Sequence, residues 1–191
     1  MTSTSPSEVV QEISALYAAR GDDEYFGEKV TQSQHALQAA ACARAAGADD
    51  ETVIAALLHD IGHLLSAGHH ADLGHIGYEQ TAEPWLRERG FGERCIALIG
   101  AHVAAKRFLV ATHPAYAAQL SDASRQTLEL QGGPMSPEEA HEFAANPLCQ
   151  EMVRLRAWDE QAKDPDAAVP GLDVYTGVIE QYLAARAGTL S

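Results

Sequence analysis

The segment "AALLHDIGHLL", residues 55–65, places two imidazoles and a carboxylate inside an otherwise apolar run. A run of this kind predicts a helix that is buried over most of its surface. A buried carboxylate without a partner is too costly to retain, and a cation is its usual partner. The fold must therefore bring further polar groups to His59, Asp60 and His63, and the segment indicates a metal site.

The length and composition of the chain predict one helical domain. Its 191 residues, 46% of them hydrophobic, suffice for one well-packed core and are short for two. No strand-like alternation rises above noise, so we expect an all-α fold. The expected unit is a single helical bundle over residues 1–191, with polar tails at 1–8 and 188–191.

Helical periodicity and capping signals place the expected helices. They cover residues 7–19, 31–46, 51–65, a stretch that ends near 89, 93–109, 114–120, 146–160 and 173–187. Asp49 or Asp50 is expected to cap the third helix, and Gly90 to end the fourth. The segment "LELQGGPMSPEEA" is expected to be a turn-rich loop, in which Ser136 caps the helix that follows.

The formal net charge of −14 disfavours nucleic acid or an anionic membrane as a partner. The apolar runs fall short of the roughly 20 residues that span a bilayer, and "MTSTSPSE" lacks the features of a signal peptide. Cys42, Cys95 and Cys149 are expected to be free thiols of a cytoplasmic protein. An anionic substrate would need a local cluster of cations, and the oligomeric state stays open.

Several expected helices pair a ligand-type residue with a polar group about one turn away. The pairs are His59 with His63, His102 with Lys106, and Arg156 with Asp159. The second and third pairs, each taken alone, are equally typical of surface charge and a core histidine. Their recurrence favours a metal centre with an anion pocket on one side, built by cations. His35, one helix upstream, is a further candidate nitrogen ligand.

The chain resembles the HD-domain superfamily in the segments "HALQAA", "LLHDIGH", "AHVAAKRFL", "LSDASRQTLELQGGPM" and "RAWDE". Within it, the chain is similar to the mixed-valent diiron oxygenases that cleave carbon–phosphorus bonds. The resemblance runs from about Tyr25 to Pro170. The His-Asp pair alone also marks metal-dependent phosphohydrolases, whereas the longer segments and "EYFGEKVTQSQH" are specific to the oxygenases.

The resemblance implies a site for two iron ions, Fe(II) and Fe(III), with O2 as co-substrate. The ligands implied for the first iron are His35, His59, Asp60 and Asp159. Asp60 bridges to a second iron, which His102 and one more histidine hold. The residues implied to grip a phosphonate are His63, Lys106, Ser124 and Arg156.

The resemblance also assigns a loop, Tyr-x-Gly-Glu, which matches Tyr25 to Glu28. In the family this tyrosine covers the open iron site until substrate arrives, and the glutamate meets the substrate's amine. The resemblance therefore implies that both residues take part in the reaction.

The remaining histidine ligand departs from the family pattern. That pattern reads "H-E-x-x-G-A-x-W-L", and the register from Trp85 in "YEQTAEPWL" puts Tyr78 at the ligand position. His75 lies just before it and is the expected ligand, because imidazole suits iron. Tyr78 stays the alternative, and His69 and His70 in the same loop are further candidates.

The function that the resemblance implies is O2-dependent cleavage of a 1-hydroxy-2-aminoalkylphosphonate, which releases phosphate. Two substrates stay open, 1-hydroxy-2-aminoethylphosphonate, which gives glycine, and its N-trimethyl analogue, which gives glycine betaine. The acidic and aromatic run around Tyr25 suits either amine. The main alternative is an HD-type metal-dependent phosphohydrolase. A non-catalytic metal or anion-binding module and a diiron oxygenase of a diol are further alternatives.

Overall fold

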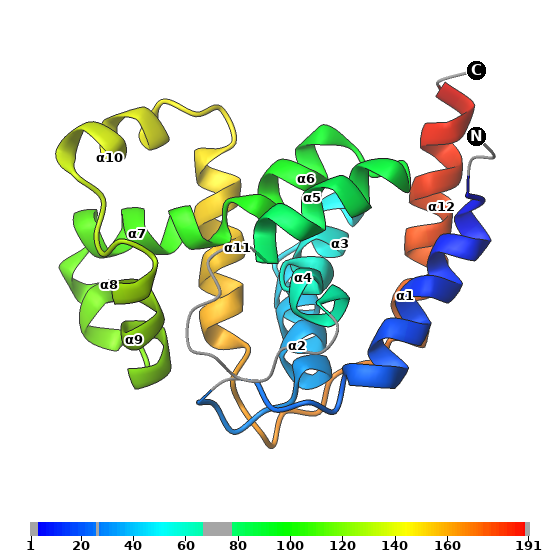
Figure 1. Ribbon diagram of the computed structural model, residues 1–191, viewed down its shortest axis with the longest axis horizontal. Coiled ribbons are helices and arrows are strands. Elements are labelled where there is room, and N and C mark those ends of the chain that lie inside the picture. The colour runs from blue at the N-terminus through cyan, green and yellow to red at the C-terminus, as the bar shows by residue number, and fades with distance from the viewer. Residues whose placement is uncertain (1–3, 26, 67–77, 190–191) are drawn as a thin grey trace.

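In this computed structural model the chain folds into helices joined by short connections. The structure describes residues 4–25, 27–66 and 78–189, and for 78–81 it describes the backbone alone. Within these ranges there are twelve helices and no strand, which confirms the all-α class (Figure 1). The helices are α1 (Pro6–Arg20), α2 (Gln32–Ala45), α3 (Asp50–Leu58), α4 (Ile61–Leu65), α5 (Tyr78–Glu88), α6 (Glu93–Gly100), α7 (His102–Thr112), α8 (Pro114–Gln119), α9 (Asp122–Leu130), α10 (Pro137–Ala144), α11 (Cys149–Gln161) and α12 (Asp173–Thr189).

Capping residues in the sequence set where several helices begin. Ser5, Thr31 and Ser136 each form a capping box, in which the N-cap side chain and the third helical residue exchange hydrogen bonds. The N–H of Thr52 donates to Asp49 Oδ1 at 2.8 Å, so Asp49 caps α3. The expected caps at Asp49 and Ser136 are thus confirmed.

Helix α3 lies at the centre of the molecule. Every residue from Thr52 to Leu58 is buried, as the apolar composition of this segment predicts. It packs against α2, α6, α11 and α12. Helices α1 and α12 lie side by side on one flank, and α8, α9 and α10 surround α7 on the other (Figure 1).

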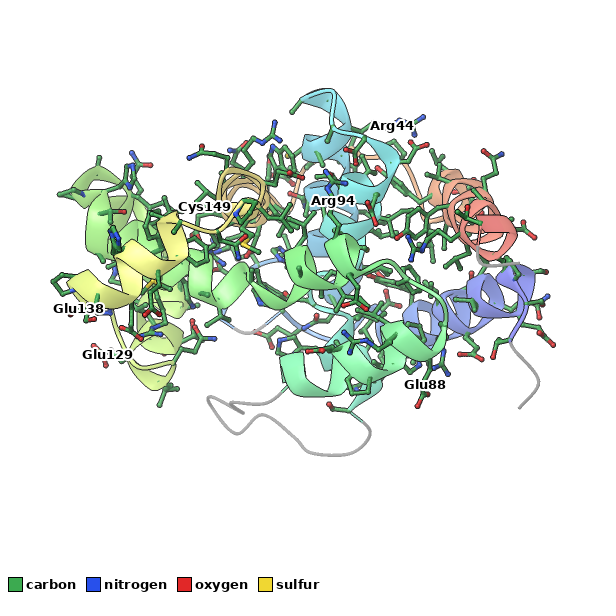
Figure 2. All side chains as sticks on the ribbon, turned by 90° about the horizontal axis from the view of Figure 1, so that it is seen from above. Arg44, Glu88, Arg94, Glu129, Glu138 and Cys149 are labelled. Atoms are coloured by element: carbon green, nitrogen blue, oxygen red, sulfur yellow. The ribbon has the colours of Figure 1, made fainter. Side chains whose placement is uncertain are left out.

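Arg94 on α6 ties together two of the helices that carry site residues (Figure 2). Its guanidinium contacts Asp49 at 2.9 Å and Glu51 at 3.0 Å, both at the start of α3. It also pairs with Glu151 on α11. This shared cation fixes α3 relative to α11 on the side away from the His-Asp segment.

The helix expected over residues 51–65 is two helices, so the prediction that His59 and His63 share one continuous helical face is wrong. α3 ends at Leu58 and α4 begins at Ile61, with Asp60 at φ −106° and ψ 17° between them. Adjacent side chains of a straight helix diverge by about 100°. The break instead lets His59 and Asp60 face one point, with Nε2 and Oδ2 3.3 Å apart.

The helix expected over residues 93–109 is also divided, into α6 and α7, which meet at an angle of 52°. Gly100 ends α6, and glycine is a poor helix former. The bend makes His102 the first residue of α7. Among the described residues no single helix is long and apolar enough to cross a membrane, although α6 and α7 pass that criterion together as a bent pair.

Other boundaries differ by smaller amounts. The sequence places residues 128–130 in a loop, whereas they form the last turn of α9, where Leu128 is buried. α1 begins at Pro6, inside the expected N-terminal tail, and α12 runs to Thr189. α11 begins at Cys149 because a turn precedes it, in which Asn146 Oδ1 accepts from the N–H of Leu148 at 2.8 Å. The three cysteines are free, as expected.

Candidate metal centre

Three buried side chains from separate helices form a cluster of metal-ligating groups. His35 comes from α2, His59 from the junction of α3 and α4, and Asp159 from α11. One ligand atom of each lies within 4.8 Å of the others. His35 Nε2 is 3.0 Å from His59 Nε2 and 3.4 Å from Asp159 Oδ1. Residues far apart in the sequence therefore meet at one buried point.

The imidazole rings of this region are oriented by backbone carbonyl groups. The contacts, each 2.8 Å long, join Nδ1 of His35 to Ala162 O, Nδ1 of His59 to Ala56 O, and Nδ1 of His102 to Ile99 O. A carbonyl oxygen only accepts, so each Nδ1 carries the hydrogen. In the neutral rings Nε2 then presents a lone pair, which is how metal-binding histidines are commonly held.

The cluster fits a metal ion. The Nε2 atoms of His35 and His59 face one another at 3.0 Å, so in the metal-free protein one of them must carry a proton, and a bound metal ion would take the place of that proton. Asp159 Oδ1 is buried and makes no hydrogen bond. A metal–nitrogen bond of about 2.1 Å puts two ligands at right angles about 3.0 Å apart. Imidazole and carboxylate together suit iron among other transition metals.

Asp60 lies between two sets of imidazoles. Its Oδ2 is 3.3 Å from His59 Nε2 and 3.6 Å from His35 Nε2. Its Oδ1 is 3.4 Å from His102 Nε2 and 3.8 Å from His63 Nε2. The two carboxylate oxygens thus face different rings, which is the arrangement that a carboxylate shared by two metal ions requires.

The structure brings together all but one of the predicted iron ligands. Those that converge are His35, His59, Asp60, His102 and Asp159. His75 lies outside the described residues, as do His69 and His70. Tyr78 begins α5, where only the backbone is described. The choice between His75 and Tyr78 therefore stays a prediction.

The charges of the cluster are set by its own members. Burial alone would raise the pKa of Asp60, but the neighbouring His59 holds that pKa well below its usual range. Burial has the same effect on Asp159, where the Arg156 guanidinium holds the pKa far below normal. Burial would lower the pKa of His59, yet Asp60 raises it to about 9. Both carboxylates are therefore ionised and attract a cation.

Tyr25 covers this cluster. Its ring stacks on that of His35, with centroids 3.9 Å apart and planes 18° apart. The loop turns back directly, because the N–H of Glu28 donates to the Tyr25 carbonyl at 2.9 Å. Burial, and next the Asp60 charge, raise the pKa of Tyr25 well above its usual value, so the side chain stays a neutral phenol. The predicted Tyr-x-Gly-Glu loop thus lies against a predicted ligand.

Gly27 gives this loop its shape, and its replacement by alanine is expected to be destabilising. Gly27 has φ 69°, and an added Cβ would lie 2.9 Å from the Cβ of Ala123. We expect Gly27→Ala to lower the free energy of unfolding by about 2–3 kcal/mol, from backbone strain and overpacking. Chemical denaturation of the variant and the wild type measures this loss of stability.

Gly133→Ala is the matched control, because Gly133 has φ 71° and nothing within 4 Å of an added Cβ. It is expected to lose about 1 kcal/mol from the backbone alone. The loss in the double variant Gly27→Ala/Ala123→Gly is expected to be smaller than the sum of the two single losses, because the close approach of the two Cβ atoms is absent from it. Equal losses at Gly27 and Gly133 would show that the approach to Ala123 has no energetic effect.

The residues predicted to grip a phosphonate lie beside the cluster. Arg156 pairs with Asp159 and with Glu160, and Ser124 Oγ donates to Glu160 Oε2 at 3.3 Å. Lys106 is buried and its Nζ donates to Thr127 Oγ1 at 2.8 Å. Ser124 and Arg156 therefore share a carboxylate, and Arg156 connects these residues to the cluster through Asp159.

His63 lies at the open side of the same region. Its Nε2 is 3.8 Å from Asp60 Oδ1, and its side chain is 40% exposed. The main chain that follows it is held by Arg20, whose Nη1 donates to the carbonyls of His63 at 2.8 Å and Ser66 at 2.6 Å. Four predicted site histidines have a described distance to Asp60. Of these, His63 has the side chain most exposed to solvent.

Three further polar residues, Tyr116, Glu160 and Lys163, contact the residues predicted to grip the phosphonate. None of the three is among the predicted site residues. Tyr116 Oη accepts from Arg156 Nε at 2.8 Å. Lys163 Nζ donates to Ser124 Oγ at 2.9 Å and pairs with Glu160 at 2.8 Å. Glu160 lies four residues after Arg156, and Lys163 lies four residues after Asp159. This is the one-turn interval of the predicted pairs, so it is the signal that could have found Glu160 and Lys163.

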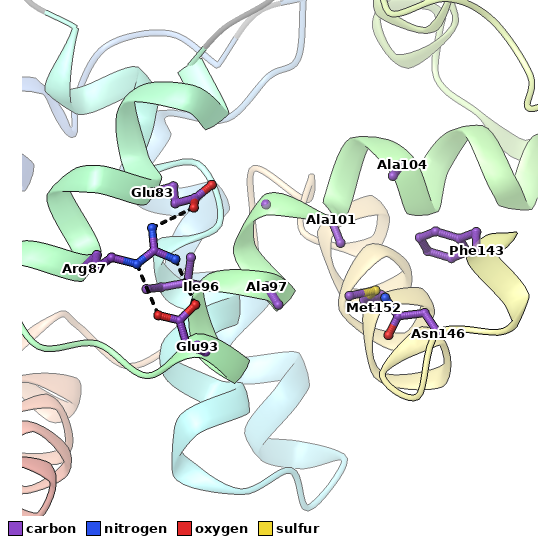
Figure 3. Close-up of a pocket in the computed structure, with 11 residues that line it drawn as sticks. Glu83, Arg87, Glu93, Ile96, Ala97, Ala101, Ala104, Phe143, Asn146 and Met152 are labelled. Carbon is purple, nitrogen blue, oxygen red and sulfur yellow. Dashed lines mark hydrogen bonds and ion pairs between the residues drawn. The ribbon is translucent and has the colours of Figure 1, made fainter. Parts of the chain in front are cut away.

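A separate surface pocket lies away from this chemistry (Figure 3). Arg87 at its edge pairs with Glu83 at 2.7 Å and Glu93 at 2.8 Å, and apolar side chains such as Ile96 and Phe143 form much of the remaining wall. Among the described residues that line this pocket there is no histidine, and its two carboxylates, Glu83 and Glu93, share the single guanidinium of Arg87. We therefore place the candidate site at the His/Asp cluster and the buried cations beside it, Lys106 and Arg156.

Fold and site together define a helical protein with a buried imidazole and carboxylate cluster of the kind that holds metal. No protein-family model matches the chain. It is 36% identical over 187 residues to [1-hydroxy-2-(trimethylamino)ethyl]phosphonate dioxygenase (glycine-betaine-forming) of Leisingera caerulea, covering 94% of this chain and 93% of that protein. It is 39% identical over 189 residues to hydroxymethylphosphonate dioxygenase of Gimesia maris, covering 95% and 91%.

An uncharacterized protein of Acanthamoeba polyphaga mimivirus is 39% identical over 179 residues, covering 92% of this chain and 82% of that protein. These similarities extend over nearly the whole of each protein. The chain therefore belongs to the family of these phosphonate dioxygenases.

Proposed function

We propose that this chain is a diiron oxygenase that uses O2 to cleave the C–P bond of a 1-hydroxyalkylphosphonate. The products are a carboxylic acid and inorganic phosphate, which balances one phosphonate and one O2. The observation that carries the proposal is the junction of two features, an Asp60 carboxylate facing imidazoles on both sides and a group of buried cations joined to the same cluster through the Arg156–Asp159 pair. The printed names of two relatives support the reaction.

The residues proposed to hold the irons follow from this geometry and the resemblance. The first set is His35, His59, Asp60 and Asp159, and the second is Asp60, His102 and His75. When bound, an Fe(II)/Fe(III) pair supplies the reduction of O2 and the Lewis acidity that the reaction needs. Ionised Asp60 and Asp159 offset part of the metal charge inside a buried site.

The remaining residues bind and orient the substrate. Lys106 and Arg156 are proposed to neutralise the phosphonate dianion, and Ser124 to donate a hydrogen bond to it. His63 is proposed to contact the same group from the open side. Tyr25, stacked on His35, is proposed to cover the cluster and exclude water until substrate displaces it. An HD phosphohydrolase, the alternative, has no need of such a cover.

The test is the stoichiometry of the reaction. We expect the iron-loaded protein to consume one O2 for each phosphate released from a 1-hydroxyphosphonate, and to release none under anaerobic conditions. A matched phosphonate without the 1-hydroxyl group is the control and is expected to give neither signal. Phosphate release in the absence of O2 would overturn the proposal in favour of the phosphohydrolase.

The proposed substrates share the 1-hydroxyphosphonate unit and differ in what else C1 carries. The sequence leaves open 1-hydroxy-2-aminoethylphosphonate, which would give glycine, and its N-trimethyl analogue, which would give glycine betaine. The name of the Gimesia maris relative adds hydroxymethylphosphonate. Membership of the HD-domain superfamily and a cytoplasmic location stay predictions.

The proposed role of Lys106 predicts a pH dependence. Burial, and next the charge of Arg156, lower the pKa of Lys106 to about 8. The ammonium form binds the phosphonate, so binding is intact below this pKa and is lost as the pH rises through it. Because kcat/KM reports the free enzyme, it is expected to fall above pH 8, approaching about tenfold per pH unit.

Lys106→Arg is the control for this profile, since arginine keeps its charge at these pH values. The variant is expected to lose the fall of kcat/KM near pH 8 or to shift it to higher pH. A fall at the same pH in both proteins would assign the titration to another group.

A further inference from the structure

Lys163 contacts residues assigned to both ends of the proposed substrate, the phosphonate end and the amine end. Its Nζ is 2.9 Å from Ser124 Oγ, at the end assigned to the phosphonate. It is 3.1 Å from Oε1 of Glu28, the residue that the resemblance assigns to the substrate's amine. It is also 2.8 Å from Glu160 Oε1. One ammonium group therefore spans both ends.

One carboxylate oxygen of Glu28 already has two protein partners. The same Oε1 accepts a hydrogen bond from Ser121 Oγ at 2.6 Å and faces Lys163 Nζ at 3.1 Å. The Lys163 and Glu28 side chains are only 12% and 13% exposed, so solvent screens their attraction little. A substrate ammonium that sought Glu28 would have to share this carboxylate with Lys163.

A lysine displaced from Glu28 would keep only Glu160 among its described carboxylate partners, and it would share that residue with Arg156. Glu160 already pairs with Arg156 as well as with Lys163. Asp159, next to it, pairs with Arg156. A second cation beside Lys163 would therefore add like-charge repulsion in a partly buried site, where such repulsion is weakly screened. A trimethylammonium group meets the same repulsion and has no N–H with which to bond to Glu28.

We propose that Lys163 is a specificity-determining residue. By neutralising Glu28 it selects 1-hydroxyphosphonates whose carbon chain carries no cationic group, with hydroxymethylphosphonate as the simplest case, over the amino and trimethylamino substrates. This inference rests on the proposed function, because that function puts the phosphonate beside Ser124. It differs from the family expectation for the glutamate, since here the glutamate is held by a protein cation.

The experiment compares three substrates on the iron-loaded full chain: hydroxymethylphosphonate, 1-hydroxy-2-aminoethylphosphonate and its N-trimethyl analogue. Dissociation constants are measured anaerobically, and kcat and KM with O2. The wild type is expected to favour hydroxymethylphosphonate by about tenfold or more in kcat/KM. In Lys163→Met this preference over the amino substrate is expected to fall by at least about tenfold, through KM and Kd with similar changes in kcat for both substrates.

The ratio of kcat/KM between two substrates isolates the effect of Lys163 on the part of the substrate that carries the amine. Lys163 also contacts Ser124 and Glu160, but losses there affect the shared phosphonate and cancel in the ratio. Lys163→Arg keeps the charge and is expected to retain the wild-type preference. Adding Glu28→Gln to Lys163→Met is expected to remove the gain for the amino substrate, which a merely structural role of Lys163 would not do.

The outcomes separate this inference from the proposed function. Preferential binding of hydroxymethylphosphonate without O2-dependent phosphate release keeps the inference and refutes the function. Turnover of all three with a preference for an amine, or an unchanged ratio in Lys163→Met, keeps the function and overturns the inference. Binding of none of the three overturns both.

Discussion

Asp60→Ala is expected to abolish turnover and to leave the chain unable to hold two iron ions. Asp60 is the residue whose two carboxylate oxygens face different imidazoles, those of His59 and His102. Replacing a group that only orients a metal ligand typically costs about 10–100-fold in affinity or activity. Loss of the shared ligand itself is expected to exceed that range. Iron content by elemental analysis and O2 uptake measure the two effects.

Asp166→Ala is the matched control, because Asp166 is an exposed aspartate away from the cluster. It is expected to keep two irons per chain and full activity. Circular dichroism of both variants establishes that the helices are retained. If Asp60→Ala kept two irons and full turnover, the bridging role of Asp60 would be wrong.

Arg156→Met is expected to lower the free energy of unfolding of the metal-free protein by about 3–5 kcal/mol. Arg156 is 4% exposed and pairs with the carboxylates of Asp159 and Glu160. Methionine fills much of the same volume, so the loss is mainly that of the charge. It leaves Asp159 buried and ionised without its cation. Urea denaturation in the presence of a chelator measures the change.

Arg125→Met tests whether the loss is specific to the buried pair. Arg125 pairs with Asp122 one turn away, and these side chains are 50% and 93% exposed. An exposed pair of this kind contributes about 0–1 kcal/mol, so little change is expected. A loss below about 1 kcal/mol for Arg156→Met as well would mean that Asp159 finds another way to balance its charge.

Much of the architecture follows from local patterns in the sequence. The capping residues Asp49 and Ser136 begin helices where expected, and the apolar segment before His59 is the buried central helix. These features depend on hydrogen bonds and periodicity within a few residues, which a sequence carries directly. The break at Asp60 follows no such pattern, because the side chain there contacts imidazoles of other helices, whereas the break after Gly100 has a local signal in the glycine itself.

The candidate site divides in the same way. His35, His59, His102 and Asp159 are identifiable as ligand types, and the structure brings them together with Asp60. The one-turn interval from Asp159 points to Lys163, but the contact of Lys163 with Glu28 joins the end of α11 to a loop far away in the chain. No interval within one helix predicts that contact.

The sequence by itself determined that this protein is all-α and that a buried imidazole and carboxylate site needs a cation. Both conclusions rest on local chemistry, namely helical periodicity and the cost of an unpaired buried charge. Only the tertiary structure decided that the two oxygens of Asp60 face different rings and that the Ala162 carbonyl orients His35. The same holds for the ion pair between Lys163 and Glu28. Such contacts are set by how whole helices pack, so the distance along the chain carries no information about them.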